Sequence, residues 1–297
     1  MIISTSGRSS SKRRYEKLLK DLKIEAQVNY ETFDVAGEGD ACAFAAMLRR
    51  KDTNKMCIGG AISKGIKASI IKELDSLDAT AEVQQSVNTV VVSPIDGSLK
   101  GYNSDVLGFR IAIAAAMPTD EPFKSAIIYG YGGVTLVASR VLMSLGMDAG
   151  NIFITGRDQS KARARAAELG VRAWADIAEE SRAREGVDLF VNATPVTDRD
   201  LSLAANFLPA LEATRRAVFD HEMPGQKLKD WLDSSNRNRN GNSSNREREL
   251  VYISGLDMYR PQCVEQWALF LAGYASKEEV AAALNALFAQ EDAEENR

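Results

Sequence analysis

Histidine and cysteine are scarce in this chain of 297 residues, and their scarcity excludes several kinds of active site. His221 is the single histidine, so a metal site built from several histidines is excluded and any Ser/His/Asp triad would depend on that residue. The cysteines, Cys42, Cys57 and Cys263, form no C-x-x-C pair, which argues against a disulfide framework or a cysteine-ligated zinc. We expect no metal, and general acid–base chemistry would fall to lysine, aspartate or tyrosine.

Long apolar runs and an excess of basic charge are also missing. No apolar stretch reaches the roughly 18 residues of a membrane helix, and the N-terminal stretch lacks a signal-peptide core. The net charge of −4 offers no broad basic field to nucleic acid or to a membrane surface. With 45% hydrophobic and 26% charged residues, the composition is that of a globular protein long enough for two domains. The sequence predicts a cytoplasmic protein, a monomer or homodimer, whose partners are small molecules and neither nucleic acid nor membrane.

Apolar β-branched runs alternate with helical patterns along the chain, which is typical of an α/β architecture. The predicted strands cover residues 2–5, 27–35, 55–62, 87–94, 125–130, 151–156, 187–194, 216–220 and 250–254. The predicted helices include residues 13–22, 69–77, 136–146 and 159–170. The polar, low-complexity segment 234–249 can bury little apolar surface, so we predict a disordered loop there, with a basic nucleic-acid contact as the alternative.

The clearest motif joins the predicted strand ending at Tyr129 to a helical pattern through three glycines, Gly130, Gly132 and Gly133. In a dinucleotide-binding fold, such a turn brings backbone N–H groups and a helix N-terminus to a pyrophosphate. Glycine turns of this kind also serve tight packing in other α/β proteins. The motif therefore needs support from the strands that follow it.

The next predicted strand ends at Gly156-Arg157-Asp158, where a dinucleotide-binding fold contacts the adenosine ribose. Arg157, with Lys161 one turn later, suits a 2′-phosphate, whereas Asp158 suits either a helix cap or the free 2′-hydroxyl of NAD. The basic pair favours NADP over NAD as the cofactor. A third strand ends in the segment from Asn192 to Pro195, at the carboxyl edge where ligands of such sheets lie.

These motifs are part of a longer ordered set: S-x-S near the start, a lysine in a glycine-containing segment, V-N-T-V-V, G-Y-N-S-D-x-x-G-F, G-Y-G-G, G-R-x-x-x-K, V-N-A-T and G-L-D-M-x-x-x-Q. In this order and spacing, over roughly residues 7–275, the chain resembles the shikimate dehydrogenase family. The resemblance implies two α/β domains. Residues 1–104 with 255–297 would form the substrate domain, to which the C-terminal helices return, and residues 105–254 a Rossmann-like NADP-binding domain.

The resemblance also implies an activity and a set of site residues. The activity is the NADPH-dependent reduction of 3-dehydroshikimate to shikimate in aromatic amino acid biosynthesis, with substrate bound in a cleft between the domains. Lys67 and Asp105 match the catalytic pair, and Lys64 is a rival for Lys67. The matching substrate-binding positions are Ser9, Ser11, Ser63, Asn88 and Gln262. The cofactor-binding positions are Gly130, Gly132, Gly133, Arg157, Lys161, Asn192, Thr194, Gly255 and Met258.

The chemistry of these residue types agrees with that implication. Reduction of a ketone needs a proton donor to the developing alkoxide, and a lysine held by a carboxylate is suited to the task. Taken alone, Asp105 before an apolar helical run would be a helix N-cap. One carboxylate has two oxygens and can serve both roles.

Four segments depart from the family pattern. The pattern N-V-T-x-P-x-K becomes residues 61–67 without its asparagine and proline, and D-M-x-Y-x-P becomes residues 220–224 without its tyrosine. G-L-G-M has an acid, Asp257, and S-K-S-P lacks its proline. These departures leave three hypotheses: a shikimate dehydrogenase, a quinate or quinate/shikimate dehydrogenase, and a non-catalytic sensor similar to the dehydrogenase-like module of fungal quinate-pathway repressors. Retention of Lys67, Asp105, Asn88 and Gln262 favours catalysis, since binding alone would not require the lysine–aspartate pair.

Overall fold

The computed structural model describes residues 1–5, 9–37, 39–52, 55–63, 65–117, 121–176, 186–195, 206–223, 226–241 and 249–295. The chain divides into a first unit, Met1–Leu107 with Arg260–Arg297, and a second unit, Gly108–Tyr259. Both divisions fall within helices, α4 (Asp105–Ala116) and α10 (Gly255–Leu271). The boundaries expected from the sequence coincide instead with the first residues of these two helices.

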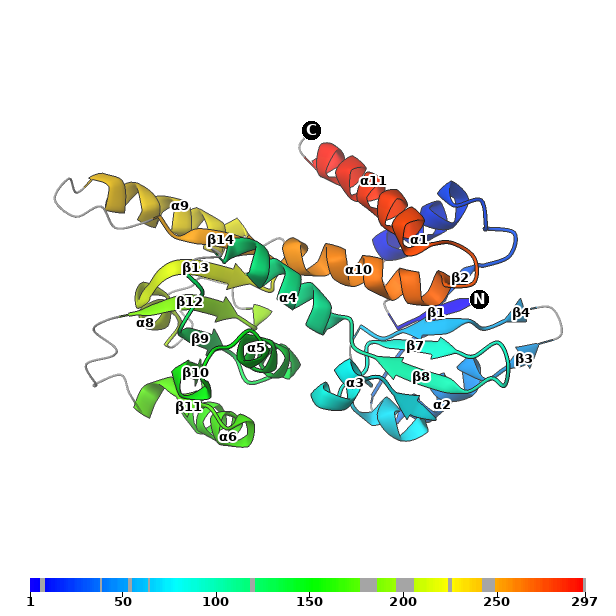
Figure 1. Ribbon diagram of the computed structural model, residues 1–297, viewed down its shortest axis with the longest axis horizontal. Helices are drawn as coiled ribbons and strands as arrows, with labels where there is room; N and C mark the ends of the chain where they lie inside the picture. The colour runs from blue at the N-terminus through cyan, green and yellow to red at the C-terminus, as the bar shows by residue number, and fades with distance from the viewer. Residues whose placement is uncertain are drawn as a thin grey trace. The chain divides into compact units, whose positions relative to one another are not determined.

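The first unit is built on a mixed sheet of six strands in the order β2-β1-β5-β7-β8-β6 (Figure 1). The strand β1 pairs in parallel with β2 and β5, whereas β7 runs antiparallel to both β5 and β8. The strands are β1 (Ile2–Ser4), β2 (Tyr30–Thr32), β5 (Gly59–Ala61), β6 (Ser76–Leu77), β7 (Thr89–Val92) and β8 (Leu99–Tyr102), with a separate hairpin of β3 (Lys51–Asp52) and β4 (Lys55–Met56). The strand β6 replaces the end of the helix predicted over 69–77.

The helices of the first unit are α1 (Ser9–Asp21), α2 (Asp40–Leu48), the 3-10 helix η1 (Ser69–Glu73), α3 (Ala79–Gln84), the C-terminal part of α10, and α11 (Lys277–Glu295). Helices α1 and α11 lie side by side (Figure 1), and Arg14 Nε donates to Glu291 Oε1 across them at 2.7 Å. The buried ring of Trp267 in α10 lies 4.5 Å from that of Tyr15, centroid to centroid. The C-terminal helices therefore return to the first unit, as predicted.

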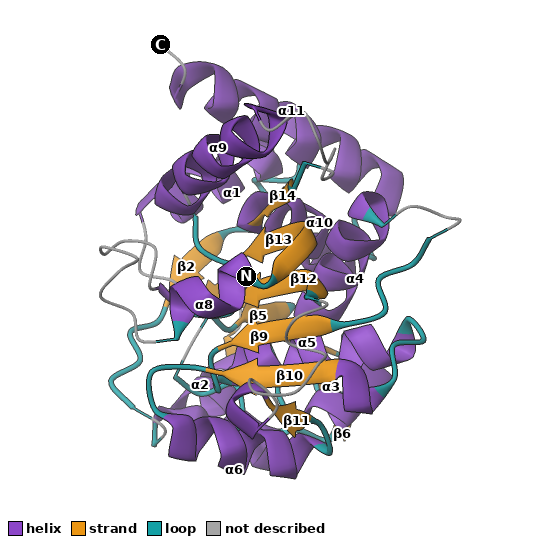
Figure 2. Cartoon of the chain, turned by 90° about the vertical axis from the view of Figure 1, so that its left-hand side faces the viewer, coloured by secondary structure: helices purple, strands orange, loops and turns teal. Residues whose placement is uncertain are grey.

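The second unit is built on an entirely parallel sheet in the order β11-β10-β9-β12-β13-β14, seen from bottom to top in Figure 2. Its strands are β9 (Ala126–Tyr129), β10 (Ile152–Thr155), β11 (Arg172–Ala173), β12 (Val187–Asn192), β13 (Thr214–Asp220) and β14 (Val251–Ser254). Counted along the chain from β9, this order is 3-2-1-4-5-6, the order of the doubly wound dinucleotide-binding fold. The strands β9 and β10 are buried along their whole length, as expected of a parallel sheet covered on both faces.

The helices of the second unit include α5 (Gly133–Ser144), α6 (Gln159–Leu169), α8 (Phe207–Glu212), α9 (Gln226–Gly241) and the 3-10 helices η2 (Ala149–Asn151) and η3 (Trp174–Asp176). Helix α9 corrects the disordered loop predicted for 234–249, because residues 234–241 are helical. Leu228 and Leu232 anchor the helix in the core, and further along, Asn236 Nδ2 donates to Leu250 O at 3.1 Å while Leu250 N donates to Asn236 Oδ1 at 2.9 Å. Composition cannot reveal these tertiary contacts; residues 242–248 lie outside the described residues.

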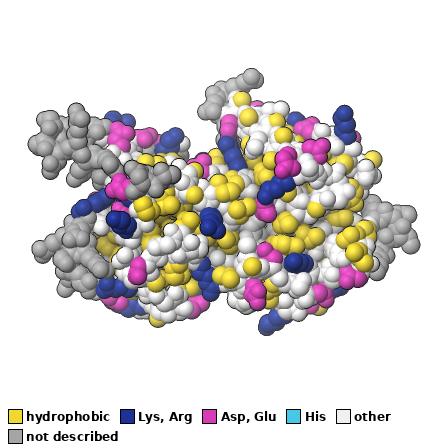
Figure 3. All heavy atoms as spheres, in the orientation of Figure 1, with side chains coloured by type: hydrophobic (Ala, Val, Ile, Leu, Met, Phe, Trp, Pro, Cys, Tyr) yellow, Lys and Arg dark blue, Asp and Glu magenta, His cyan; other side chains and the backbone are white. Residues whose placement is uncertain are grey.

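Each unit has its own apolar core. In the first unit Phe44, Leu48 and Val90 pack with neighbouring aliphatic side chains, and in the second Phe190 and Phe207 belong to a corresponding cluster. Within the described ranges, no helix combines the length and the apolar character needed to span a membrane. On the face drawn in Figure 3, lysine and arginine side chains are scattered among aspartate and glutamate.

Candidate active site

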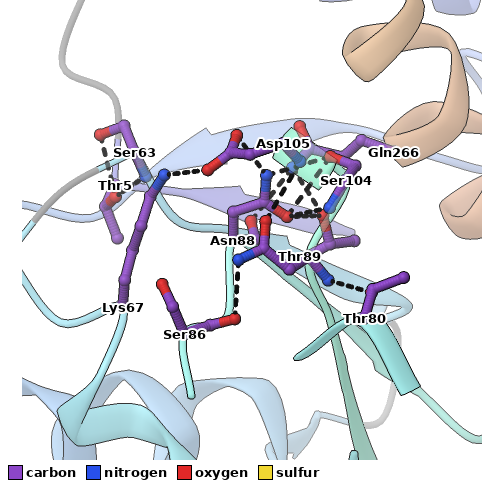
Figure 4. Close-up of polar contacts among 11 residues, drawn as sticks. Thr5, Ser63, Lys67, Thr80, Ser86, Asn88, Thr89, Ser104, Asp105 and Gln266 are labelled. Carbon is purple, nitrogen blue, oxygen red and sulfur yellow. Dashed lines mark hydrogen bonds and ion pairs between the residues drawn. The ribbon is translucent and has the colours of Figure 1, made fainter. Parts of the chain in front are cut away.

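A lysine–aspartate ion pair lies at the centre of a polar cluster in the first unit (Figure 4). Lys67 Nζ donates to Asp105 Oδ2 at 2.8 Å, with the two side chains 28% and 14% exposed. Asp105 is the first residue of α4, and Lys67 lies two residues before η1. Partial burial strengthens the attraction between the charges, while the lysine remains accessible to a small molecule.

Asn88 orients the other carboxylate oxygen. Its Nδ2 donates to Asp105 Oδ1 at 2.8 Å and to Ser104 Oγ at 3.0 Å. Its Oδ1 accepts from Ser104 N at 2.9 Å and from Thr89 Oγ1 at 2.8 Å. Asn88 is only 1% exposed, so these partners fix the orientation of its amide group. The sequence resemblance predicts Asn88 here, whereas Ser104 and Thr89 were not singled out.

A glutamine of α10 completes the cluster, and it is not the glutamine predicted from the sequence. Gln266 Nε2 donates to Asn88 O at 3.0 Å and to Thr89 Oγ1 at 2.9 Å (Figure 4). Gln262 lies one turn earlier on the same face of the helix, because residues four apart share a face. The spacing Q-x-x-x-Q is the sequence signal that points to Gln266.

The loop that carries Lys67 is held without the proline of the family pattern. Gly65 has φ +87°, and a Cβ there would lie 2.9 Å from Val35 Cγ1, so neither proline nor another L-residue fits. Ile66 is buried, and Val87 N donates to Lys67 O at 2.8 Å. A glycine turn, an apolar anchor and a backbone hydrogen bond therefore fix the loop; the rival Lys64 lies outside the described residues.

The predicted serines lie in different settings. Ser63 N donates to Thr5 Oγ1 at 2.9 Å, and the two hydroxyl oxygens are 3.2 Å apart (Figure 4). Ser11 is buried in α1. Ser9 begins α1, and its side chain lies outside the described part of the chain. The roles of these serines remain predictions.

The start of α4 shows how Asp105 relates to helix capping. Asn103 Oδ1 accepts from Asp105 N at 3.1 Å, and Asn103 is itself held by Thr80 Oγ1, which accepts from its N–H at 3.0 Å. Asp105 is inside the helix and not before it. Its carboxylate accepts from Asn88 and Lys67, while Asn103 satisfies the first backbone donor of the helix.

The second unit contains a pocket of about 280 Å³ at the carboxyl ends of β9, β10 and β12. This is the point where the strand order reverses on either side of β9, which is where doubly wound sheets bind ligands. The lining residues are Tyr129, Gly130, Tyr131, Gly132, Gly156, Arg157, Ala193, Thr194 and Pro195. Four predicted cofactor residues, Gly130, Gly132, Arg157 and Thr194, are thereby brought together.

The glycine turn fits a pyrophosphate. Gly130 has φ +130°, and a Cβ there would lie 2.9 Å from Thr194 Cγ2, so the position requires glycine. A Cβ at Gly132 or at Gly133, the first residue of α5, would meet no atom of the described chain within 4 Å. Open space over backbone N–H groups at a helix N-terminus is what a phosphate needs.

The end of β10 presents Arg157 to the same pocket, and Lys161 follows one turn later in α6. Asp158 Oδ1 accepts from Ser160 N at 3.0 Å and from Lys161 N at 3.1 Å, so the carboxylate caps α6. Lys161 Nζ lies 3.9 Å from Asp158 Oδ2, in an exposed position, and Arg157 is exposed at the pocket. Of the two roles predicted for Asp158, a helix cap and a contact with the free 2′-hydroxyl of NAD, the structure shows the helix cap.

Three other predicted cofactor residues lie away from the pocket lining. Asn192 is buried; its Nδ2 donates to Asp220 Oδ1 at 2.8 Å, and its Oδ1 accepts from Thr194 Oγ1 at 2.8 Å. It holds the loop that carries Thr194. Gly255 begins α10, and Met258 is buried.

The acid that departs from the family pattern in G-L-D-M has a local explanation. Asp257 is exposed, and its Oδ2 accepts from Ser254 N at 2.8 Å. Ser254 Oγ in turn accepts from Leu256 N at 3.2 Å. This reciprocal arrangement is a capping box that satisfies free backbone donors at the start of α10.

The strand order and the glycine-lined pocket define the second unit as a Rossmann-like unit, joined in one chain to a unit with a lysine–aspartate pair. The particular proteins that the chain is similar to are shikimate dehydrogenases. It is 34% identical over 157 residues to the shikimate dehydrogenase (NADP(+)) of Methanocaldococcus jannaschii, covering 48% of this chain and 53% of that protein. It is 33% identical over 162 residues to that of Paramagnetospirillum magneticum, covering 52% and 56%. The chain spans about half the length of the curated relatives it matches, and no family model matches it.

Solved structures extend the similarity of fold to almost the whole chain. A shikimate 5-dehydrogenase-like protein superposes with a TM-score of 0.70 at 20% identity, covering 97% of this chain and 96% of that one. Shikimate 5-dehydrogenase from Thermus thermophilus, in complex with NADP(H) and shikimate, superposes with a TM-score of 0.67 at 22% identity, covering 96% and 98%. The fold of the chain is therefore that of shikimate dehydrogenases, as predicted.

Proposed function

We propose that the chain is an NADP-dependent oxidoreductase that interconverts 3-dehydroshikimate and shikimate in aromatic amino acid biosynthesis. The observation that carries the proposal is the ion pair between Lys67 and Asp105, backed by Asn88. The curated relatives are named shikimate dehydrogenase (NADP(+)), and the T. thermophilus protein binds NADP(H) and shikimate, which supports the same function.

Lys67 is the proposed proton donor. Reduction of a ketone adds a hydride to carbon, which NADPH supplies when bound, and a proton to oxygen. The Lys67 ammonium gives its proton to the developing alkoxide, and in the reverse direction the neutral amine takes it back. Asp105, 2.8 Å from Nζ, directs the ammonium and stabilises its charge between turnovers.

The surrounding amides and hydroxyls are the proposed positioning groups. Asn88 fixes the Asp105 carboxylate, and Gln266 fixes Asn88 through its backbone carbonyl. Short hydroxyl groups at Ser9, Ser11 and Ser63, with the amide of Gln262, suit a polyhydroxylated ring and its carboxylate, because each can donate a hydrogen bond.

The second unit is the proposed NADP site. The turn from Gly130 to Gly133 would hold the pyrophosphate, and Arg157 with Lys161 the 2′-phosphate. The choice of NADP over NAD is supported by Asp158, whose carboxylate is engaged as the helix cap. Gly255 and Met258 remain predictions for the nicotinamide side.

The direct test is a spectrophotometric assay. NADPH absorbance is followed with 3-dehydroshikimate, and NADP+ or NAD+ is offered with shikimate and with quinate. We expect turnover with the shikimate pair and loss of about 100-fold or more in kcat for Lys67→Ala, with no change for the exposed Lys72→Ala. No turnover with any pair, together with calorimetric binding of a metabolite, would support the sensor hypothesis instead. Full activity of Lys67→Ala would move the assignment to Lys64.

The cofactor assignment has its own test. Arg157→Ala should weaken NADPH binding by about 10-fold or more and leave NADH binding nearly unchanged, because the guanidinium would contact only the 2′-phosphate. Calorimetry with both nucleotides measures the two effects. An equal loss for both would count against the phosphate contact.

A further inference from the structure

Two tyrosines flank the first glycine of the turn, and they have different surroundings. Tyr129 ends β9, is buried, and packs its ring edge-on against Phe207 with centroids 4.8 Å apart. Burial raises the pKa of Tyr129 to about 12. Tyr131 is partly exposed and lines the pocket. Packing of the core accounts for Tyr129 but not for the aromatic ring at position 131.

The ring of Tyr131 lies against the end of β10. A Cβ at Gly156 would lie 3.0 Å from Tyr131 Cε1 and 3.2 Å from Cδ1, so the absence of a side chain at Gly156 lets the ring approach the backbone. Lys161 Nζ lies 5.9 Å from the centre of the same ring, within the range of a cation–π contact. The ring therefore sits between the glycine turn and the cations proposed for the 2′-phosphate.

Helix α6 also holds the glycine turn itself. Arg165 follows Lys161 by four residues and shares its face of the helix. Arg165 Nη2 donates to Gly132 O at 3.4 Å, and its Nη1 to Glu168 Oε1 at 2.6 Å. Because α6 contacts the turn at two residues, through Lys161 at the Tyr131 ring and Arg165 at Gly132, the position of the ring is fixed by more than its own loop.

We propose that Tyr131 is a binding and specificity-determining residue for the nucleotide: its ring stacks with the adenine base and holds Lys161 close to the 2′-phosphate. This inference rests on the proposed function and deepens it. An aromatic ring at a pocket wall stacks with any flat base. A cation over that ring adds attraction for a phosphate, and only a 2′-phosphorylated nucleotide would benefit.

Calorimetry on the full chain with NADPH, NADH and 2′,5′-ADP tests the proposal. Tyr131→Ala should weaken the binding of NADH by about 10-fold through loss of stacking, and the binding of NADPH by more, because Lys161 also loses the ring that holds it. Tyr131→Phe, which keeps the ring, should bind within about twofold of the wild type. Lys161→Ala should weaken NADPH and 2′,5′-ADP but not NADH. Tyr274→Ala, a matched change at a tyrosine 39% exposed in the first unit, should change nothing.

Tyr131→Leu keeps an apolar side chain of similar bulk but has no aromatic ring. This variant can replace Tyr131→Ala if the alanine variant fails to fold. Stacking predicts that the leucine variant binds as weakly as the alanine variant. Wild-type affinity in either variant, or tighter binding after the ring is removed, would overturn the role of Tyr131 while leaving the proposed function intact. Failure of the wild-type chain to bind NADPH or 2′,5′-ADP would overturn the proposed cofactor and the inference with it.

Discussion

Two asparagine–aspartate pairs, one in each unit, each have a buried asparagine and are held by nearly the same hydrogen bonds. In the first unit Asn88 Nδ2 donates to Asp105 Oδ1 at 2.8 Å, and in the second Asn192 Nδ2 donates to Asp220 Oδ1 at 2.8 Å. Each amide oxygen accepts from a threonine hydroxyl at 2.8 Å and from a backbone N–H. The two asparagines are 1% and 0% exposed.

The two pairs differ in the further residue that lies next to the aspartate. Asp105 accepts from Lys67 and is 14% exposed, whereas Asp220 is fully buried and lies near the Tyr252 phenol, whose pKa it raises. A carboxylate that holds an accessible ammonium can support proton transfer, while one enclosed with a phenol links three strands of the sheet. An asparagine thus orients a carboxylate in both units, and the remaining neighbour of the carboxylate and its exposure decide what the acid does.

The largest effect on turnover is expected when the charge of Asp105 is removed and its shape is kept. In Asp105→Asn the amide must offer its oxygen to Asn88, which places its NH2 group opposite the Lys67 ammonium, where two donors meet. We expect kcat for shikimate oxidation to fall by about 100-fold or more. The melting temperature should change by only a few degrees, since the shape of the side chain is kept. Steady-state kinetics and thermal unfolding measure the two effects.

Asp233→Asn, an exposed position in α9, is the control for Asp105→Asn and should be neutral in both measurements. An Asp105→Asn protein with normal turnover would show that the carboxylate serves only the fold. In that case Asp105 would be equivalent to Asp220, and the distinction between the two pairs would disappear.

Replacing each of the two asparagines by alanine tests whether the two asparagine–aspartate pairs have different roles. Asn88→Ala and Asn192→Ala each remove one hydrogen bond to a carboxylate oxygen and one from a backbone N–H, so each should lower the free energy of unfolding by about 2–3 kcal/mol. Denaturant titration measures this loss. At temperatures where both variants are folded, only Asn88→Ala should also lose kcat. Equal kinetic losses in the two variants would contradict separate roles.

Strands β9 and β10 of the parallel sheet were predictable because they are buried on both faces and therefore form continuous apolar runs, whereas the two-residue strand β11 was not predicted. The first unit was harder, since its strands are short and their pairing is not local. The strand β8 was not predicted, because Leu99–Tyr102 begins a segment rich in turn-forming residues. Residues 76 and 77 were expected to be helical, whereas they pair with β8 across the chain.

The residues of the candidate site, too, could be predicted only in part. The ordered motifs predicted Lys67, Asp105 and Asn88, and the structure places Lys67 and Asn88 each within hydrogen-bonding distance of Asp105. Gln266 was missed because helical periodicity alone does not say which of two glutamines on one face lies deeper. Tyr131 was missed because only the fold brings its ring to Gly156 and Lys161. Contacts between residues far apart in sequence carry this information, and local patterns do not.

The smallest effect is expected at the residue that lies next to the aspartate of the second pair. Tyr252→Phe removes the phenol hydroxyl beside Asp220 and should lower the free energy of unfolding by about 1 kcal/mol at neutral pH. Desolvation, and then the neighbouring Asp220 carboxylate, raise the pKa of Tyr252 above its ordinary value of 10.0. Above about pH 10 the unfolded tyrosine therefore ionises before the folded one, so the wild-type protein loses stability as the pH rises.

The variant lacks this ionisation, and Tyr129, whose pKa is raised in the same direction, is common to both proteins. The difference in unfolding free energy between wild type and Tyr252→Phe should therefore be constant up to about pH 9 and shrink above pH 10. Denaturant titrations between about pH 7 and pH 11 measure it. A difference that stays constant, or grows, across this range would mean that the folded protein does not raise the pKa of Tyr252, and the enclosed pair would then lack the neighbour that sets it apart from Asn88 and Asp105.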